Sequence, residues 1–180
     1  IIFFKMKKII LIFFLIIKST LANAEDYNFK KLVNLKSPWG STFINDKELI
    51  ITEKGGKIKI FNIITNKIIE VGHNLRFREH GQGGLLDIIY SDNNLWISYT
   101  EKRGDWETST SIAKAKLDKD ELKFKNIFQA YPPIESRYHF GSRLAIKDNY
   151  LFASVGERGE GMIAQDPKQH PGSIIRIHLD

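Results

Sequence analysis

Two polar side chains stand just ahead of strand-like apolar runs, and glycines flank each of them. Gln82 lies in the segment GQGG (residues 81–84), and His139 lies in the segment YHFG (residues 138–141). A neutral imidazole can take up a proton near neutral pH, which makes His139 a candidate general base. A side-chain amide both donates and accepts hydrogen bonds, so Gln82 suits a polyol or a quinone carbonyl. The alternatives are a structural histidine and an amide that only orders its own loop.

Histidine spacing and cysteine content argue against a metal centre built from this chain alone. The five histidines are His73, His80, His139, His170 and His178, and no pair has the H-x-H or H-x-x-x-H spacing that is typical of zinc sites. The chain has no cysteine, so thiolate ligands and disulfides are excluded. We expect no metal ligand among these residues.

The positive net charge comes mainly from the N-terminus. Of the formal charge of +6, four units belong to the lysines of residues 1–24, which contain no acid. The rest of the chain holds 23 basic and 21 acidic residues in scattered positions. Because no basic stripe with interleaved aromatic residues is present, the sequence argues against nucleic acid as a partner.

Residues 1–24 are typical of a secretory leader. Met6 and two lysines precede an apolar stretch at residues 9–17, and residues 22–24 (ANA) match an A-x-A cleavage site. This stretch is shorter than the roughly 20 residues that cross a bilayer, so a membrane anchor is the weaker alternative. We expect Met6 to be the true start and residues 1–24 to be a signal peptide. The mature chain is then periplasmic or secreted, without membrane insertion after cleavage.

Short strands and turns repeat after the leader, and no segment shows a convincing helical period. Alternating hydrophobicity and turn dipeptides predict strands at residues 42–44, 48–53, 57–63, 67–71, 85–90, 95–100, 110–117, 122–128, 143–146, 150–155 and 173–179. Leu49, Leu95 and Leu151 take equivalent places in the second strand of three successive sets. Repeats of this length and strand number predict β-propeller blades.

The predicted fold class is therefore all-β, with three N-terminal propeller blades of which the third is incomplete. A complete sandwich of three sheets is the alternative. Because an open propeller leaves unpaired strand edges, we expect residues 25–180 to be the N-terminal half of a catalytic propeller domain and to be inactive alone. The long loop at residues 160–171 is a further candidate for binding.

Six segments in a fixed order resemble the soluble quinoprotein sugar dehydrogenases, that is, the glucose/sorbosone and aldose sugar dehydrogenases that use pyrroloquinoline quinone (PQQ). They are SPWG (37–40), GQGGLLD (81–87), YT (99–100), HFGSRL (139–144), GERG (156–159) and GSIIR (172–176). Each segment is weak by itself, but together they extend over nearly all of residues 35–180. The resemblance implies a six-bladed β-propeller, in agreement with the repeat.

The resemblance also implies a reaction and a site. The expected oxidoreductase transfers hydride from the anomeric carbon of an aldose sugar to PQQ. Electrons then pass from the reduced PQQ to an external acceptor. His139 matches the base of the family, and Gln82 and Arg143 match contacts to substrate or cofactor. Tyr138 stands where the glucose-oxidising branch has an aspartate, which favours the broader aldose branch. The remaining PQQ contacts and the calcium ligands of the family lie in later blades, so both cofactors need residues beyond position 180.

Two other functions remain open at this point. A calcium-dependent, lactonase-like hydrolase would need clustered Glu, Asn and Asp on the inner strands, whereas the strand entries carry Gln82 and His139. A secreted propeller without catalysis could bind a sugar or a protein partner through the same loops.

Overall fold

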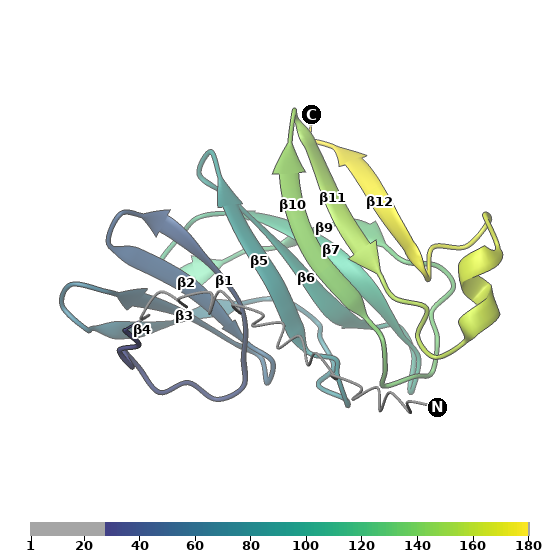
Figure 1. The fold of residues 1–180 in the computed structure, drawn as a ribbon, viewed down its shortest axis with the longest axis horizontal. Helices are drawn as coiled ribbons and strands as arrows, with labels where there is room; N and C mark the ends of the chain where they lie inside the picture. The colour runs from purple at the N-terminus through teal and green to yellow at the C-terminus, as the bar shows by residue number, and fades with distance from the viewer. Residues whose placement is uncertain (1–27, 180) are drawn as a thin grey trace, which may run out of the picture. The chain divides into compact units, whose positions relative to one another are not determined.

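The computed structural model describes residues 28–179, and the strands of residues 31–179 form three sheets that follow one another along the chain (Figure 1). The first sheet contains β1 (Pro38–Asn45), β2 (Glu48–Glu53), β3 (Lys57–Asn62), β4 (Ile68–His73) and the short β8 (Glu121–Leu122). The second contains β5 (Leu85–Ser91), β6 (Asn94–Lys102), β7 (Thr108–Lys116) and β9 (Lys125–Gln129), and the third contains β10 (Gly141–Lys147), β11 (Tyr150–Val155) and β12 (Ser173–His178). The predicted leader lies outside the described residues. Among residues 28–179, no helix is long and apolar enough to cross a membrane.

The three sheets are the predicted blades, and their repeat has the predicted register. Within each sheet, consecutive strands pair antiparallel in chain order, apart from the added β8. Leu49, Leu95 and Leu151 are the second residues of β2, β6 and β11, as the aligned repeat requires. The third sheet has three strands, so the prediction of an incomplete third blade is confirmed for the described residues.

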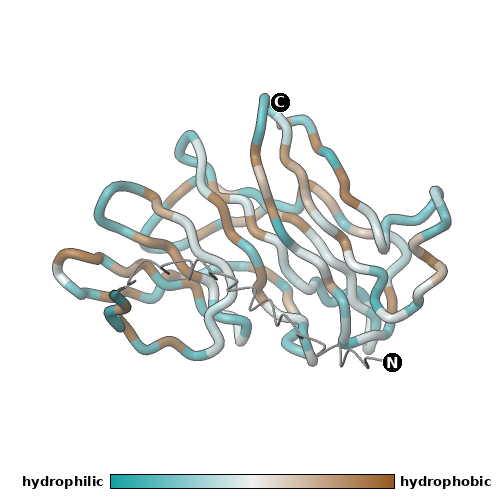
Figure 2. Tube along the Cα trace, in the orientation of Figure 1, coloured by the Kyte–Doolittle hydropathy of each residue, from teal (hydrophilic) through white to brown (hydrophobic). Residues whose placement is uncertain are grey.

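Hydrophobic side chains from neighbouring sheets form two cores. Figure 2 shows hydrophobic residues along the strands and hydrophilic residues at many of the turns that join them. Ile50 and Ile60 of the first sheet pack with Ile97 of the second, and all three are buried. Trp96 of the second sheet packs with Leu151 of the third in a separate cluster. Alternate side chains of one strand point to opposite faces of its sheet. The middle sheet therefore contributes side chains to both cores.

The prediction of one outer strand at residues 122–128 is wrong, because the structure divides this segment between two sheets. β8 pairs in parallel with β4 of the first sheet, whereas β9 pairs with β7 of the second. Leu122 and Phe124 enter the core between these sheets and are 0 % and 5 % exposed. The side chain of Asn74 accepts from the backbone N–H of Phe124 and donates to its carbonyl. The apolar residues that indicated one strand thus belong to a crossing between blades.

The loop predicted at residues 160–171 contains one short 3₁₀ helix, Gly161–Gln165, and reaches from β11 to β12. It has no buried residue in that helix. Its far end is fixed because the backbone N–H of Tyr131 donates to Nδ1 of His170, and the N–H of His170 donates to the carbonyl of Tyr131. The segment is therefore held at its base and exposed at its turn.

The first strands of the three sheets, β1, β5 and β10, carry a bulge at the same place. Their register against the second strand shifts at residues 38–41, 85–88 and 141–144. A bulge leaves backbone groups outside the strand ladder, and buried groups of this kind need another hydrogen-bond partner. Gly40, Asp87 and Arg143 are equivalent residues of these bulges.

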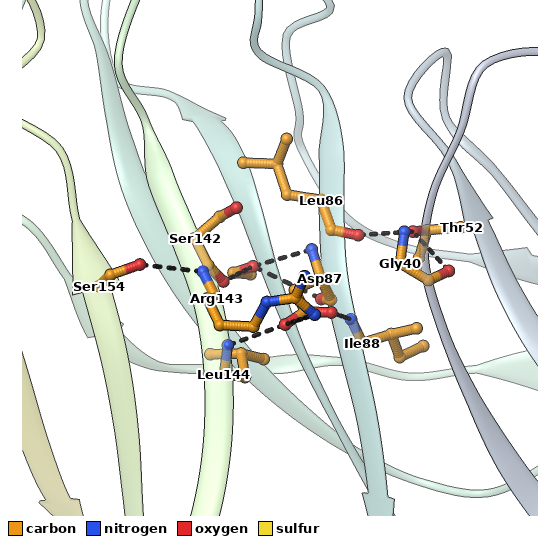
Figure 3. Close-up of polar contacts among 10 residues, drawn as sticks. Gly40, Thr52, Leu86, Asp87, Ile88, Ser142, Arg143, Leu144 and Ser154 are labelled. Atoms are coloured by element: carbon orange, nitrogen blue, oxygen red, sulfur yellow. Dashed lines mark hydrogen bonds and ion pairs between the residues drawn. The ribbon is translucent and has the colours of Figure 1, made fainter. Parts of the chain in front are cut away.

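A buried hydroxyl group joins the first bulge to the second sheet (Figure 3). Thr52 of β2 accepts from the N–H of Gly40 at 2.9 Å and donates to the carbonyl of Leu86 at 2.5 Å. Gly40 has no side chain because β5 lies directly against it: an added Cβ would lie 2.7 Å from Cα of Asp87. The Thr52 side chain therefore satisfies backbone groups of two sheets at their closest approach.

The same arrangement recurs one blade later. Ser98 of β6 accepts from the N–H of Asp87 at 3.0 Å and donates to the carbonyl of Ser142 at 2.7 Å. Ser154 of β11 holds the corresponding place and accepts from the N–H of Arg143 at 3.0 Å. A hydroxyl in the second strand is thus the repeated contact by which one bulged strand is tied to the next.

Replacing Thr52 by valine should destabilise the protein, because valine keeps the shape but removes the hydroxyl. The buried N–H of Gly40 and carbonyl of Leu86 would lose a partner, for an expected loss of about 1–3 kcal/mol in the free energy of unfolding. Thr65→Val, in an exposed turn, is the matched control and should change stability by less than about 0.5 kcal/mol. Urea denaturation measures both variants, and equal stabilities would contradict the bridging role.

Candidate active site

His139 and Glu157 face each other from two loops at one end of the third sheet. His139 lies two residues before β10, and Glu157 lies two residues after β11. Because Gly141 pairs with Val155, the start of β10 lies beside the end of β11 and the two loops meet. The imidazole Nδ1 contacts Oε1 of Glu157, and the two side chains are 55 % and 28 % exposed.

The charge of Glu157 decides which nitrogen of His139 can act as a base. The backbone N–H of Gly159 donates to Oε2 of Glu157 at 2.5 Å, and this bond, followed by the contact with His139, holds the pKa of the carboxyl below its usual range. The carboxylate can only accept, so neutral His139 donates through Nδ1–H. The free lone pair of the ring is then on Nε2, which is the atom that can take up a proton.

Gln82 holds the backbone of His139. Its side-chain Oε1 accepts from the backbone N–H of His139 at 2.8 Å, and its backbone N–H donates to the carbonyl of Arg137 at 2.9 Å. His139 has a φ of +49°, a left-handed conformation that such contacts must stabilise. The structure therefore brings Gln82 and His139 together, and it shows the loop-ordering bond that was the alternative to a ligand contact.

Gly156 allows the two loops to approach. A Cβ at this position would lie 1.9 Å from the carbonyl oxygen of His139. The N–H of Gly156 also donates to the carbonyl of Phe140 at 3.2 Å. Any larger residue would push Glu157 away from the imidazole, so the pair requires glycine here.

Arg143 lies in a different place from the pair. Its side chain is 82 % exposed, and its Nη1 lies 3.4 Å from Oδ2 of the buried Asp87. Together with Trp39, Gly141 and Ser142, these residues line a hollow of about 290 Å³ between the bulges of the first strands. Asp87 also accepts from the N–H of Leu144 at 2.8 Å, so it fixes β10 against β5 (Figure 3).

Sequence reasoning did not assign Glu157, Asp87 or Arg158 to the site. Aligning the three blades would have placed Asp87 at the position of Gly40 and Arg143, next to the predicted contact residue. Glu157 could have been found from its place after β11, beside the glycine that the loop requires. Arg158 is also buried, at 2 % exposed, and this burial has no comparable signal because GERG resembles an exposed turn in the sequence.

Comparison with known proteins identifies the family of the chain. The glucose/sorbosone dehydrogenase family matches residues 35–180, most of the chain. The chain belongs to the glucose/sorbosone dehydrogenase family. Over 153 residues it is 29 % identical to the aldose sugar dehydrogenase YliI of Escherichia coli K12, a match that covers 79 % of this chain and 41 % of that protein.

Solved structures of the family share the fold. The soluble aldose sugar dehydrogenase of E. coli in its apo-form is 27 % identical with a TM-score of 0.76, over 81 % of this chain and 45 % of that one. The PQQ-bound aldose sugar dehydrogenase of Streptomyces coelicolor is 25 % identical with a TM-score of 0.71, again over 81 % and 45 %. The three sheets are therefore part of a β-propeller, and the chain spans less than half the length of these relatives.

The described residues fit part of a site for PQQ, a planar quinone that carries carboxylates. Arg143 presents an exposed guanidinium beside the half-exposed indole of Trp39, which suits a flat anion. A calcium site is a different matter: within residues 28–179, no three His, Cys, Asp or Glu side chains gather closely enough to hold a metal ion. Calcium ligands beyond position 180 remain a prediction.

The low pKa of Glu157 predicts a pH-dependent contribution to stability. The folded carboxyl is depressed below its unfolded value, so its contribution is present above the usual carboxyl pKa of about 4.3 and is lost as pH falls through the lower folded value. The stability difference between the wild type and Glu157→Gln should be largest above about pH 5 and should shrink on acidification.

Thermal melts at a series of pH values measure this difference. Glu160→Gln changes an exposed carboxylate of the same loop and serves as the control, with little effect at any pH. A difference for Glu157→Gln that is independent of pH would show that its charge does not stabilise the loop.

Proposed function

We propose that the protein is a PQQ-dependent aldose sugar dehydrogenase that oxidises the anomeric hydroxyl of its substrate. The observation that carries the proposal is the His139–Glu157 pair, with its proton-accepting nitrogen at an exposed loop between glycines. Family membership and the PQQ-bound relative from S. coelicolor support the choice of reaction and cofactor.

The residues of the chain supply the proton chemistry. Nε2 of His139 removes the proton of the anomeric hydroxyl, and the carboxylate of Glu157 stabilises the imidazolium that forms. When bound, PQQ accepts the hydride from the anomeric carbon. Glu157 keeps Nδ1 protonated throughout, so that only Nε2 exchanges a proton with the substrate.

Gln82 and Arg143 are assigned binding roles within this proposal. Gln82 fixes the backbone of His139 through its carbonyl oxygen and presents its amide nitrogen to a sugar hydroxyl. Arg143 faces the hollow beside Trp39, where it can pair with a carboxylate of the cofactor. Calcium and the other cofactor contacts would come from blades that follow residue 180.

The proposal includes export and an external electron acceptor. Residues 1–24 act as a cleaved signal peptide, and the remaining chain works in the periplasm or outside the cell. The reduced cofactor is then reoxidised there by an acceptor outside this chain.

Replacing His139 by glutamine tests the proposed function. With the full-length protein reconstituted with PQQ and calcium, dye-linked oxidation of aldoses should fall about 100- to 10,000-fold in kcat, because glutamine cannot take up the proton. His178→Gln, in β12, is the matched control and should retain activity.

Other outcomes would contradict the proposal. Unchanged kcat in His139→Gln would exclude His139 as the base. Metal-dependent lactone hydrolysis without PQQ would identify a hydrolase. Calorimetry that detects sugar binding but no PQQ binding would identify a non-catalytic propeller.

A further inference from the structure

We propose that Arg158 is the positioning residue of the His139–Glu157 pair, and that its buried guanidinium holds both loops in the geometry that proton transfer needs. This inference rests on the proposed function. Arg158 follows Glu157 directly, but whereas the Glu157 side chain is 28 % exposed, Arg158 is only 2 % exposed. It therefore lies beneath the pair, where it contacts neither sugar nor cofactor.

The guanidinium contacts the His139 loop both before and after His139 in the chain. Its Nε donates to the carbonyl of Tyr138 at 3.1 Å, and its Nη2 donates to the carbonyl of Ser136 at 2.6 Å. Its central carbon lies 3.7 Å from the centre of the Phe140 ring. The residues immediately before and after His139 are thus held by one rigid, planar group.

The remaining donors of Arg158 attach this loop to the second sheet. Nη1 donates to the carbonyl of Thr108 at 3.0 Å, and Nη2 donates to Oγ1 of the same residue at 2.8 Å. Thr108 is the first residue of β7 and is buried. The backbone N–H of Arg158 also donates to the carbonyl of His139 at 3.3 Å. One residue therefore connects the Glu157 loop, the His139 loop and the neighbouring blade.

The charge of Arg158 is unusual for so buried a position. Burial lowers its pKa to about 10, so the group is still cationic at neutral pH. Among the described residues, no carboxylate forms an ion pair with its guanidinium, which binds carbonyl and hydroxyl oxygens instead. A buried cation without such a partner is expensive to desolvate. Its positive charge does favour the ionised form of Glu157, which accepts the hydrogen bond from Nδ1–H of His139.

A positioning role and a purely structural role make different predictions. If Arg158 only adds stability, its removal lowers the melting temperature but leaves each folded molecule with an intact pair. If it positions the pair, folded molecules lose the contact between Nδ1 and Glu157. The ring of His139 then no longer keeps its proton on one nitrogen, and an error of about 1 Å can reduce the rate about 100-fold.

The test uses the full-length protein with labelled histidine, in which ¹⁵N NMR reports the protonated ring nitrogen of His139. Assignment comes from the resonance lost in His139→Gln. The wild type should show the Nδ1–H tautomer, and Arg158→Met should show a mixture of both tautomers. Arg176→Met is the matched control, because Arg176 also lies over an aromatic ring, that of Tyr150 at 4.7 Å, but on β12. It should leave the tautomer unchanged.

Kinetics on the PQQ-loaded protein provide the second arm. Arg158→Met should reduce kcat about 10- to 100-fold with a smaller change in KM. The effects of Arg158→Met and Glu157→Gln should not add in the double variant, because both remove the same contact. Arg158→Lys keeps the charge but cannot make the four hydrogen bonds, so it should give an intermediate result and serves as the probe if methionine prevents folding.

The outcomes separate this inference from the proposed function. A wild-type tautomer in folded Arg158→Met or Arg158→Lys, with additive kinetic effects, would overturn the positioning role even if the enzyme is active. A tautomer mixture in a protein that oxidises no sugar would support the positioning role while the proposed function fails.

Discussion

The structure depends on one repeated contact, the buried hydroxyl that ties the bulge of one first strand to the bulge of the next. Thr52 and Ser98 each accept from a bulge N–H of their own sheet and donate to a carbonyl of the following one. A bulge without such a partner would leave buried backbone groups unsatisfied. Because the contact recurs at the same place in successive blades, each first strand is tied to the next in the same way. The loops that enter these strands therefore lie at the same end of the sheets.

The candidate site is built from these entry loops. Gln82 comes from the loop before the second sheet and His139 from the loop before the third, yet their hydrogen bond is 2.8 Å long. Glu157 arrives from the end of β11, and the buried Arg158 fixes its loop to the one that carries His139. These contacts hold the exposed imidazole of His139 in one orientation. A fixed orientation of this kind is needed for efficient proton transfer.

One position of the repeat shows how a common scaffold is adapted in each blade. Gly40, Asp87 and Arg143 are equivalent, but their side chains do different things. The first allows close approach of β5, the second fixes β10 through the N–H of Leu144, and the third presents its charge to the hollow. The backbone bond to the hydroxyl is the same in all three, so the side chain is free to vary.

The sequence by itself determined the strands, the blade repeat and the two loops that carry Gln82 and His139, because hydrophobic alternation and turn residues act locally. It did not determine that the segment at residues 122–128 crosses between sheets, since apolar side chains look the same whichever core they enter. Only the tertiary structure paired Glu157 with His139 and buried Arg158 beneath them. Those contacts join residues about 20 to 50 positions apart, and their geometry follows from strand pairing and bulges, which local patterns do not specify.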